Sequence, residues 1–123
     1  MANPNIVAVT SIYGSTSYLI PANTSATTWT ALTPAAGSVN KINNIVASNV
    51  NASAIAVTVS INSAVSGGGT AYRIAYAISV PANASLIITD KTTAFYVGEG
   101  QSVVVTVGTG SKIELTASFE TIT

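Results

Sequence analysis

Apolar and polar residues alternate with a period of two along much of this chain. The clearest run covers residues 113–119, where four apolar side chains alternate with polar ones. Runs with the same period cover residues 55–61, 74–80 and 103–107. Successive side chains of a β-strand point to opposite faces, so this pattern predicts strands that place one face in a core.

Weaker runs predict further strands at residues 6–12, 17–20, 27–32, 41–48, 86–89 and 94–97. Gly67, Gly68 and Gly69 predict a long or mobile hairpin tip, and residues 98–100 and 108–110 have the spacing of hairpin turns. No segment has an apolar stripe with the 3.6-residue period of a helix. We therefore expect an all-β fold without substantial helix: an antiparallel β-sandwich, immunoglobulin-like or jelly-roll-like.

The alternating faces also predict the core between the two sheets. On the last strand, Leu115 should face the core and Glu114 the solvent. The expected core side chains are Ile55, Val57, Val59, Ile61, Ile74, Tyr76, Ile78, Val103, Val105, Ile113, Leu115, Ala117 and Phe119.

The strongest strands all lie in residues 40–123, which we expect to form the sandwich core. Residues 1–39 are a strand-rich N-terminal segment, or arm, joined to the same domain. Two hypotheses remain for the strand at residues 6–12. It adds to the sheet of a neighbouring molecule by β-augmentation, or it is the first strand of this sandwich.

The chain has no histidine and no cysteine in 123 residues, and few charged side chains. The charged residues are Lys41, Arg73, Asp90, Lys91, Glu99, Lys112, Glu114 and Glu120. General acid–base catalysis, activated nucleophiles and metal sites draw mainly on His, Cys and clustered carboxylates. We therefore expect a protein that is not an enzyme, with no catalytic residue, no cofactor and no metal.

The few motifs that could suggest chemistry have simpler explanations. Glu114 and Glu120 are six residues apart on one strand, roughly 20 Å, too far for paired carboxylates of a glycosidase. Asp90 has no acidic neighbour to complete a calcium site. Residues 66–70 are glycine-rich but lack the Lys-Ser/Thr of a phosphate-binding loop.

Charged residues make up 7% of the chain, and the formal net charge is +0. A typical soluble domain has about a quarter charged residues, and a net charge near zero favours association. We expect a homo-oligomer whose surface is largely covered by neighbours. The alternative is an exposed surface rich in Thr, Ser and Asn, whose neutral polar groups keep the chain soluble. The dispersed basic residues predict no nucleic-acid and no membrane partner.

Four aromatic residues are candidates for partner contacts: Tyr13, Tyr18, Trp29 and Tyr72. Their rings could pack against a protein neighbour or stack on a sugar. Ordinary packing within the domain is the alternative explanation. A carbohydrate- or receptor-binding module predicts that they gather on one face of the protein.

The order of segments after residue 40 carries a resemblance. An apolar strand ends at Ser48-Asn49, and the strand at residues 55–59 follows; later come Val80-Pro81-Ala82-Asn83-Ala84-Ser85 and Val97-Gly98-Glu99-Gly100 before the last alternating strand. This succession resembles small virion proteins of tailed bacteriophages that have an immunoglobulin-like sandwich. The resemblance covers about residues 40–123, and residues 1–39 depart from it.

The resemblance implies a virion location and a structural function without catalytic residues. The first hypothesis is a head decoration, or cement, protein that contacts copies of itself and other virion proteins. A neck, collar or tail component is the alternative within this class. The carbohydrate- or receptor-binding module is the alternative from another class.

Overall fold

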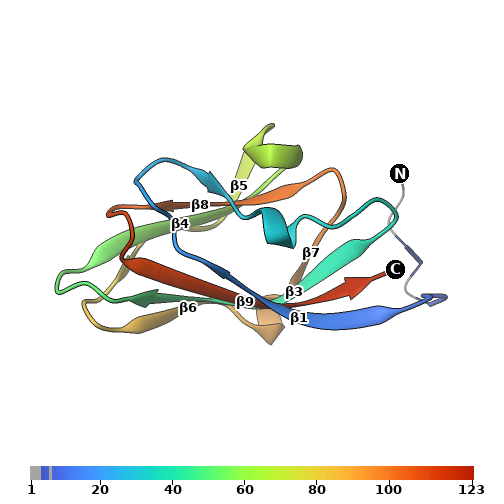
Figure 1. Ribbon diagram of the computed structural model, residues 1–123, viewed down its shortest axis with the longest axis horizontal. Coiled ribbons are helices and arrows are strands. Elements are labelled where there is room, and N and C mark those ends of the chain that lie inside the picture. Colours follow the sequence, from blue (N-terminus) through green and yellow to red (C-terminus); the bar gives the residue numbers. More distant parts are fainter. Residues whose placement is uncertain (1–3, 6) are drawn as a thin grey trace.

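Two antiparallel sheets pack face to face in the computed structural model, which describes residues 4–5 and 7–123 (Figure 1). In the first sheet the strand order is β1-β9-β3-β6, and β7 pairs with β3 beside β6. These strands are β1 (Ile12–Leu19), β3 (Val39–Asn49), β6 (Ser85–Thr89), β7 (Phe95–Val97) and β9 (Ile113–Ile122). The first sheet is the lower layer in Figure 1.

The second sheet, the upper layer in Figure 1, has the order β2-β8-β4-β5. Its strands are β2 (Thr27–Thr28), β4 (Ile55–Asn62), β5 (Ala71–Val80) and β8 (Ser102–Val107). The helical segments of the described residues are three short 3-10 turns, η1 (Thr30–Leu32), η2 (Val65–Gly67) and η3 (Lys91–Thr93). The predicted all-β antiparallel sandwich is therefore confirmed.

The core between the sheets contains most of the side chains that the alternation assigned to it. On β9, Leu115 is buried and Glu114 is exposed, as predicted. The predicted positions that are buried are Ile55, Val57, Val59, Val103, Val105, Ile113, Leu115, Ala117 and Phe119. Ile61 and Ile74 are partly buried and pack against this core.

Strand β5 corrects two predicted core positions. Tyr76 is 70% exposed and Ile78 is 36% exposed. The register between β4 and β5 shifts on both sides of Val59, and each time β5 has one residue more than β4. Each extra residue reverses the alternation. As a result Ala75 is the buried residue opposite Val59, and Tyr76 points away from the core. Ile78 pairs with the buried Val57 and keeps the core face, but it is partly exposed because β5 is an edge strand.

The predicted hairpins at residues 98–100 and 108–110 are wrong. The first of these turns joins β7 in one sheet to β8 in the other, and the second joins β8 back to β9. Both turns cross between the layers instead of joining neighbours in one sheet. A turn that joins neighbours in one sheet and a turn that crosses between sheets use similar residues. The spacing of glycines alone therefore does not distinguish the two kinds of turn.

The glycine-rich segment joins the antiparallel neighbours β4 and β5, which confirms the predicted long hairpin tip, and hydrogen bonds hold it against the second sheet. The backbone N–H of Gly67 donates to Ser102 Oγ at 2.9 Å, and Asn62 Nδ2 donates to the Gly67 carbonyl at 2.9 Å. A side chain at Gly67 would meet Thr28 Oγ1, because η2 lies close to β2 there, and the φ of +77° at Gly67 also favours glycine. The segment thus covers Ser102 and Asn62 on the outer surface of the second sheet.

The N-terminal segment contributes two strands to the same sandwich. β1 pairs with β9 and β2 pairs with β8. The strand predicted at residues 6–12 is not present in the described part of that range, since β1 begins at Ile12 and Ile6 lies outside the described residues. The strand predicted at residues 27–32 is reduced to β2, and η1 follows it.

Candidate functional site

The exposed tyrosines lie on two opposite margins of the sandwich. Tyr13 and Tyr18 belong to β1, and their side chains are 66% and 75% exposed. Tyr72, 61% exposed, belongs to β5. β1 is the edge strand at one side of the first sheet. β5 is the edge strand of the second sheet at the opposite side of the sandwich, where it contacts β6. The structure therefore brings Tyr13 and Tyr18 onto one strand and places Tyr72 at the far margin.

Trp29, the fourth candidate, lies inside the core and is 2% exposed. Its indole Nε1 donates to Ser17 Oγ at 3.0 Å, and its backbone N–H donates to the Val103 carbonyl at 2.8 Å. These bonds join β1 to the second sheet at the margin where β2 is only two residues long. The ring fills that end of the core, so we leave Trp29 out of the contact surface.

Other exposed apolar side chains lie on the outer face of the first sheet. Paired residues of neighbouring strands share a face, so the register defines a row that crosses the sheet. Tyr18 pairs with Thr116, Thr116 with Val46, and Val46 with Ile87. Tyr18 and Ile87 end this row and are 75% and 62% exposed. The sequence did not predict Ile87 as a contact residue, because the apolar–polar alternation of a strand does not show which of its two faces packs against the other sheet.

Charged groups are sparse on both sheets, and Lys41 and Glu120 lie opposite each other on β3 and β9 of the first sheet. Glu120 Oε1 accepts from Asn43 Nδ2 at 3.0 Å on the outer face of the first sheet. On β5 the guanidinium of Arg73 lies 5.3 Å from the centre of the Tyr76 ring, an exposed cation–π contact. Within the described residues, no group of three or more His, Cys, Asp or Glu side chains could hold a metal ion. In that same part of the chain, no helix has the length and apolar character to cross a membrane.

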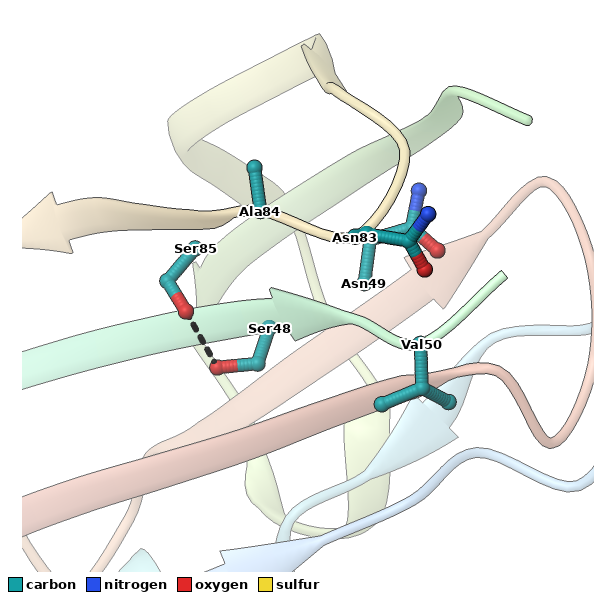
Figure 2. A pocket seen from close by; sticks show the side chains of 6 residues that line it. All are labelled: Ser48, Asn49, Val50, Asn83, Ala84 and Ser85. Atoms are coloured by element: carbon teal, nitrogen blue, oxygen red, sulfur yellow. Dashed lines mark hydrogen bonds between the residues drawn. The ribbon is translucent and has the colours of Figure 1, made fainter. Parts of the chain in front are cut away.

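Two of the shallow hollows on the surface are lined mainly by residues with polar side chains, although apolar atoms contribute much of each lining. One has a volume of about 340 Å³ and is lined by Ser48, Asn49, Val50, Asn83, Ala84 and Ser85 (Figure 2). There Ser48 and Ser85 share a hydrogen bond of 2.8 Å across β3 and β6. The other, about 530 Å³, is lined by Asn43, Asn44, Asp90, Lys91, Thr92 and Ser118. The first hollow has no titratable side chain in its lining. In the second, the Thr92 hydroxyl donates to the carboxylate of Asp90, whose lowered pKa makes it a weak base.

Asp90 caps the short turn η3 and has a lowered pKa. Its Oδ1 accepts from the Thr92 hydroxyl at 2.6 Å and from the Thr92 backbone N–H at 2.9 Å. These hydrogen bonds stabilise the charged carboxylate, so the pKa of Asp90 lies below its usual range. The arrangement stabilises the turn and offers no acid–base group near neutral pH.

Thr92→Val should raise the pKa of Asp90 toward that of an ordinary aspartate, because it removes the hydroxyl donor and keeps the side-chain shape. A lowered folded pKa stabilises the fold above the pKa of the unfolded chain, and this contribution is lost as pH falls through the folded value. Carboxyl chemical shifts in an NMR titration from pH 2 to pH 6 measure the midpoint. Thr109→Val, in a distant exposed turn, is the control. An unchanged midpoint in Thr92→Val would contradict the assigned cause.

Comparisons with known proteins give only loose likenesses. No protein-family model and no curated protein matches the chain. A structure from a study of Bacillus endospore appendages, described as disulfide-linked pili, is 16% identical with a TM-score of 0.45, covering 91% of this chain and 86% of that one. The Drosophila NLP core, described with pentamer formation and histone binding, is 17% identical with a TM-score of 0.44, covering 89% of this chain and 96% of its own.

A structure of infectious bursal disease virus, Gx strain, is 10% identical with a TM-score of 0.43. The match covers 94% of this chain and 33% of the viral chain. Superpositions this loose do not transfer a function. The functional argument therefore depends on the surface of this chain alone.

Proposed function

We propose that this chain is a non-enzymatic structural subunit that acts through protein–protein contacts, as a head decoration (cement) protein of a tailed bacteriophage virion. The observation that supports this most is the distribution of its exposed apolar side chains. Tyr13 and Tyr18 are exposed at one margin, and Tyr72 and Tyr76 at the other. A subunit that contacts neighbours on several sides needs such surfaces, whereas a single ligand site needs only one.

The scarcity of charge supports the same proposal. Large exposed aromatic side chains contribute contact area at low cost in conformational entropy, and they are enriched at protein interfaces. Here they occur on a chain with a net charge of +0, so copies do not repel one another. The neutral Thr and Ser side chains around them can form hydrogen bonds with a neighbour without the desolvation cost of charges.

The carbohydrate-binding alternative is not favoured by this arrangement. It predicts aromatic rings gathered around one hollow. The candidate tyrosines lie at opposite margins, and the two surface hollows are lined without an aromatic residue. Binding of free sugars at millimolar concentration, lost on Tyr18→Ala, would restore this alternative.

Sedimentation velocity of the purified chain tests the structural proposal. We expect the weight-average sedimentation coefficient to rise with protein concentration at physiological salt, because the apolar margins associate. Salt should have little effect, since few charges are involved. A strictly monomeric chain that is also absent from purified particles would overturn the proposal.

Quantitative mass spectrometry of purified particles tests the placement on the head. A copy number in the range of the capsid subunits is expected for a decoration protein. A copy number of a single ring would instead assign the chain to the neck or tail. Particles that lack the chain should have fragile heads under heating or low salt, and intact heads without tails would contradict the cement hypothesis.

A further inference from the structure

Three of the four sheet margins have features that hinder the addition of another strand. β2 has only two residues, and the margin next to β3 is divided between the short strands β6 and β7 with η3 between them. β5 has two register shifts, a positive φ of 48° at Ala77, and Arg73 within it. Short edges, bulges and charges are the usual means by which proteins prevent edge-to-edge pairing.

β1, the fourth margin, has none of these features. It pairs with β9 over eight consecutive residues without a register shift. It contains neither a charged residue nor a proline. Because β2 is so short, the inner side of β1 is also uncovered: Tyr13 and Ser15 are exposed although Ser15 pairs with the buried Phe119. A long, regular and uncharged edge of this kind is a template for another strand.

We propose that β1 pairs antiparallel with β1 of a second copy of this chain, around a two-fold axis through Ser15, to form one continuous sheet. This inference rests on the proposed function, in that it names the contact by which the subunits associate. Exposed backbone N–H and C=O groups of both edges would then be paired.

Symmetry restricts the register of this contact. Residues opposite each other in an antiparallel pair share a face, whereas neighbours along one strand do not. The faces of the two strands match only if a residue of β1 lies directly opposite the same residue of the second copy. A two-fold axis perpendicular to the sheet must therefore pass midway between these two equivalent residues. Axes through Ser15 or through Thr16 satisfy this condition near the middle of β1.

The apolar rows of the outer face favour the axis through Ser15. That register places Tyr18 opposite Ile12 of the second copy, an aromatic–β-branched pair that occurs twice. Ile12 begins a row of its own, since it pairs with Ile122, which pairs with Val39; Ile12 is the exposed member of this row, and the other two are buried. The row that starts at Tyr18 in one copy would thus continue as the Ile12 row of the other.

An axis through Thr16 would instead place Tyr18 opposite Gly14 of the second copy. The Gly14 row continues through Glu120 and Lys41, so the apolar row would meet charged side chains. The Ser15 axis also covers Ile12 and Tyr18, which are 52% and 75% exposed in the single chain.

The charges of the chain are compatible with a second copy as the occupant. β1 is neutral and offers no complementary group to a charged partner. The nearest acidic side chains of the first sheet, Glu114 and Glu120, lie one strand inward on β9. The two β9 strands of the dimer would be three strand spacings apart, about 14 Å, which exceeds the Debye length of about 8 Å at physiological salt.

Charge substitutions at the axis test the pairing. Ser15→Lys alone and Ser15→Glu alone should each weaken dimerisation on the order of tenfold or more, because like charges would face each other across the axis. An equimolar mixture of the two variants should restore association. Thr109→Lys, at an exposed residue of the β8–β9 turn outside both tyrosine margins, is the control and should leave dimerisation unchanged. Restoration in the mixture also shows that both variants are folded.

Single-cysteine variants test the register, since the chain has no cysteine of its own. Ser15→Cys should form a covalent dimer with an oxidant or a short thiol crosslinker, and more rapidly than Thr16→Cys. Faster crosslinking of Thr16→Cys would overturn the proposed axis. Crosslinks only in a mixture of Ser15→Cys and Ser79→Cys would show head-to-tail contact and overturn the two-fold pairing.

Two failures remain distinguishable. If the unchanged chain associates but none of the Ser15 variants changes that association, the β1 pairing is wrong and the structural function stands. If the unchanged chain is monomeric at all concentrations and absent from particles, the proposed function itself fails. Sedimentation velocity of the unchanged chain is therefore measured beside every variant.

Discussion

Trp29→Ala is expected to lower the free energy of unfolding by about 3–5 kcal/mol, the usual cost of truncating a large buried aromatic. Trp29 is 2% exposed and fills the end of the core where β2 is short. The substitution removes its apolar contacts, leaves a cavity, and removes the indole donor to Ser17 Oγ. Because small domains are typically stable by only about 5–15 kcal/mol, much of the fold's stability depends on this side chain.

Urea unfolding followed by far-ultraviolet circular dichroism measures this effect, since the variant lacks the only tryptophan of the chain. Trp29→Phe retains most of the volume and should cost less than Trp29→Ala. Tyr72→Ala, at a side chain 61% exposed, is the control and should change stability by less than about 0.5 kcal/mol. Equal losses in Trp29→Ala and Tyr72→Ala would show that the Trp29 ring does not support the core.

Asn49→Ala should lower the free energy of unfolding by about 3 kcal/mol, because it removes a hydrogen bond to the buried Val80 carbonyl and two part-buried hydrogen bonds to the β3–β4 turn. Asn49 is 2% exposed at the end of β3. Its Nδ2 donates to the Ser53 and Val80 carbonyls at 2.9 and 3.0 Å, and its Oδ1 accepts from the Asn51 N–H at 2.8 Å. One side chain thus joins the β3–β4 turn to the end of β5.

Asn49→Asp provides a sharper test of the same bonds. It retains the acceptor but directs a carboxylate toward two carbonyls, so the loss should be greatest near neutral pH and should shrink as the carboxyl is protonated. Asn43→Ala, on the same strand but half-buried and bonded to Glu120, is the control and should cost about 1 kcal/mol or less. Equal urea midpoints for Asn49→Ala and Asn43→Ala would contradict the role assigned to Asn49.

The prediction of contact residues required knowing which aromatic side chains are exposed to solvent. The sequence determines this exposure only in part. Tyr13, Tyr18 and Tyr72 are exposed in the structure, whereas Trp29 is buried. Trp29 is flanked by two threonines, whereas the exposed Tyr13 and Tyr18 each have an apolar neighbour, so the neighbours in sequence do not predict which aromatic ring is buried. The difference arises because Trp29 directly follows β2 of the second sheet and its ring packs into the core between the sheets, whereas Tyr13 and Tyr18 lie on the edge strand β1.

The sequence by itself determined the all-β class and the inward face of the regular strands. A period of two leaves one choice of buried face for a strand such as β9, where Leu115 is buried and Glu114 exposed. Only the tertiary structure decided which strands pair, and therefore which turns cross between the layers. It also decided that an extra residue in β5 points Tyr76 outward, and that β1 is the long margin left uncovered. These features depend on partners far away in sequence, and a local alternation of apolar and polar residues does not specify those partners.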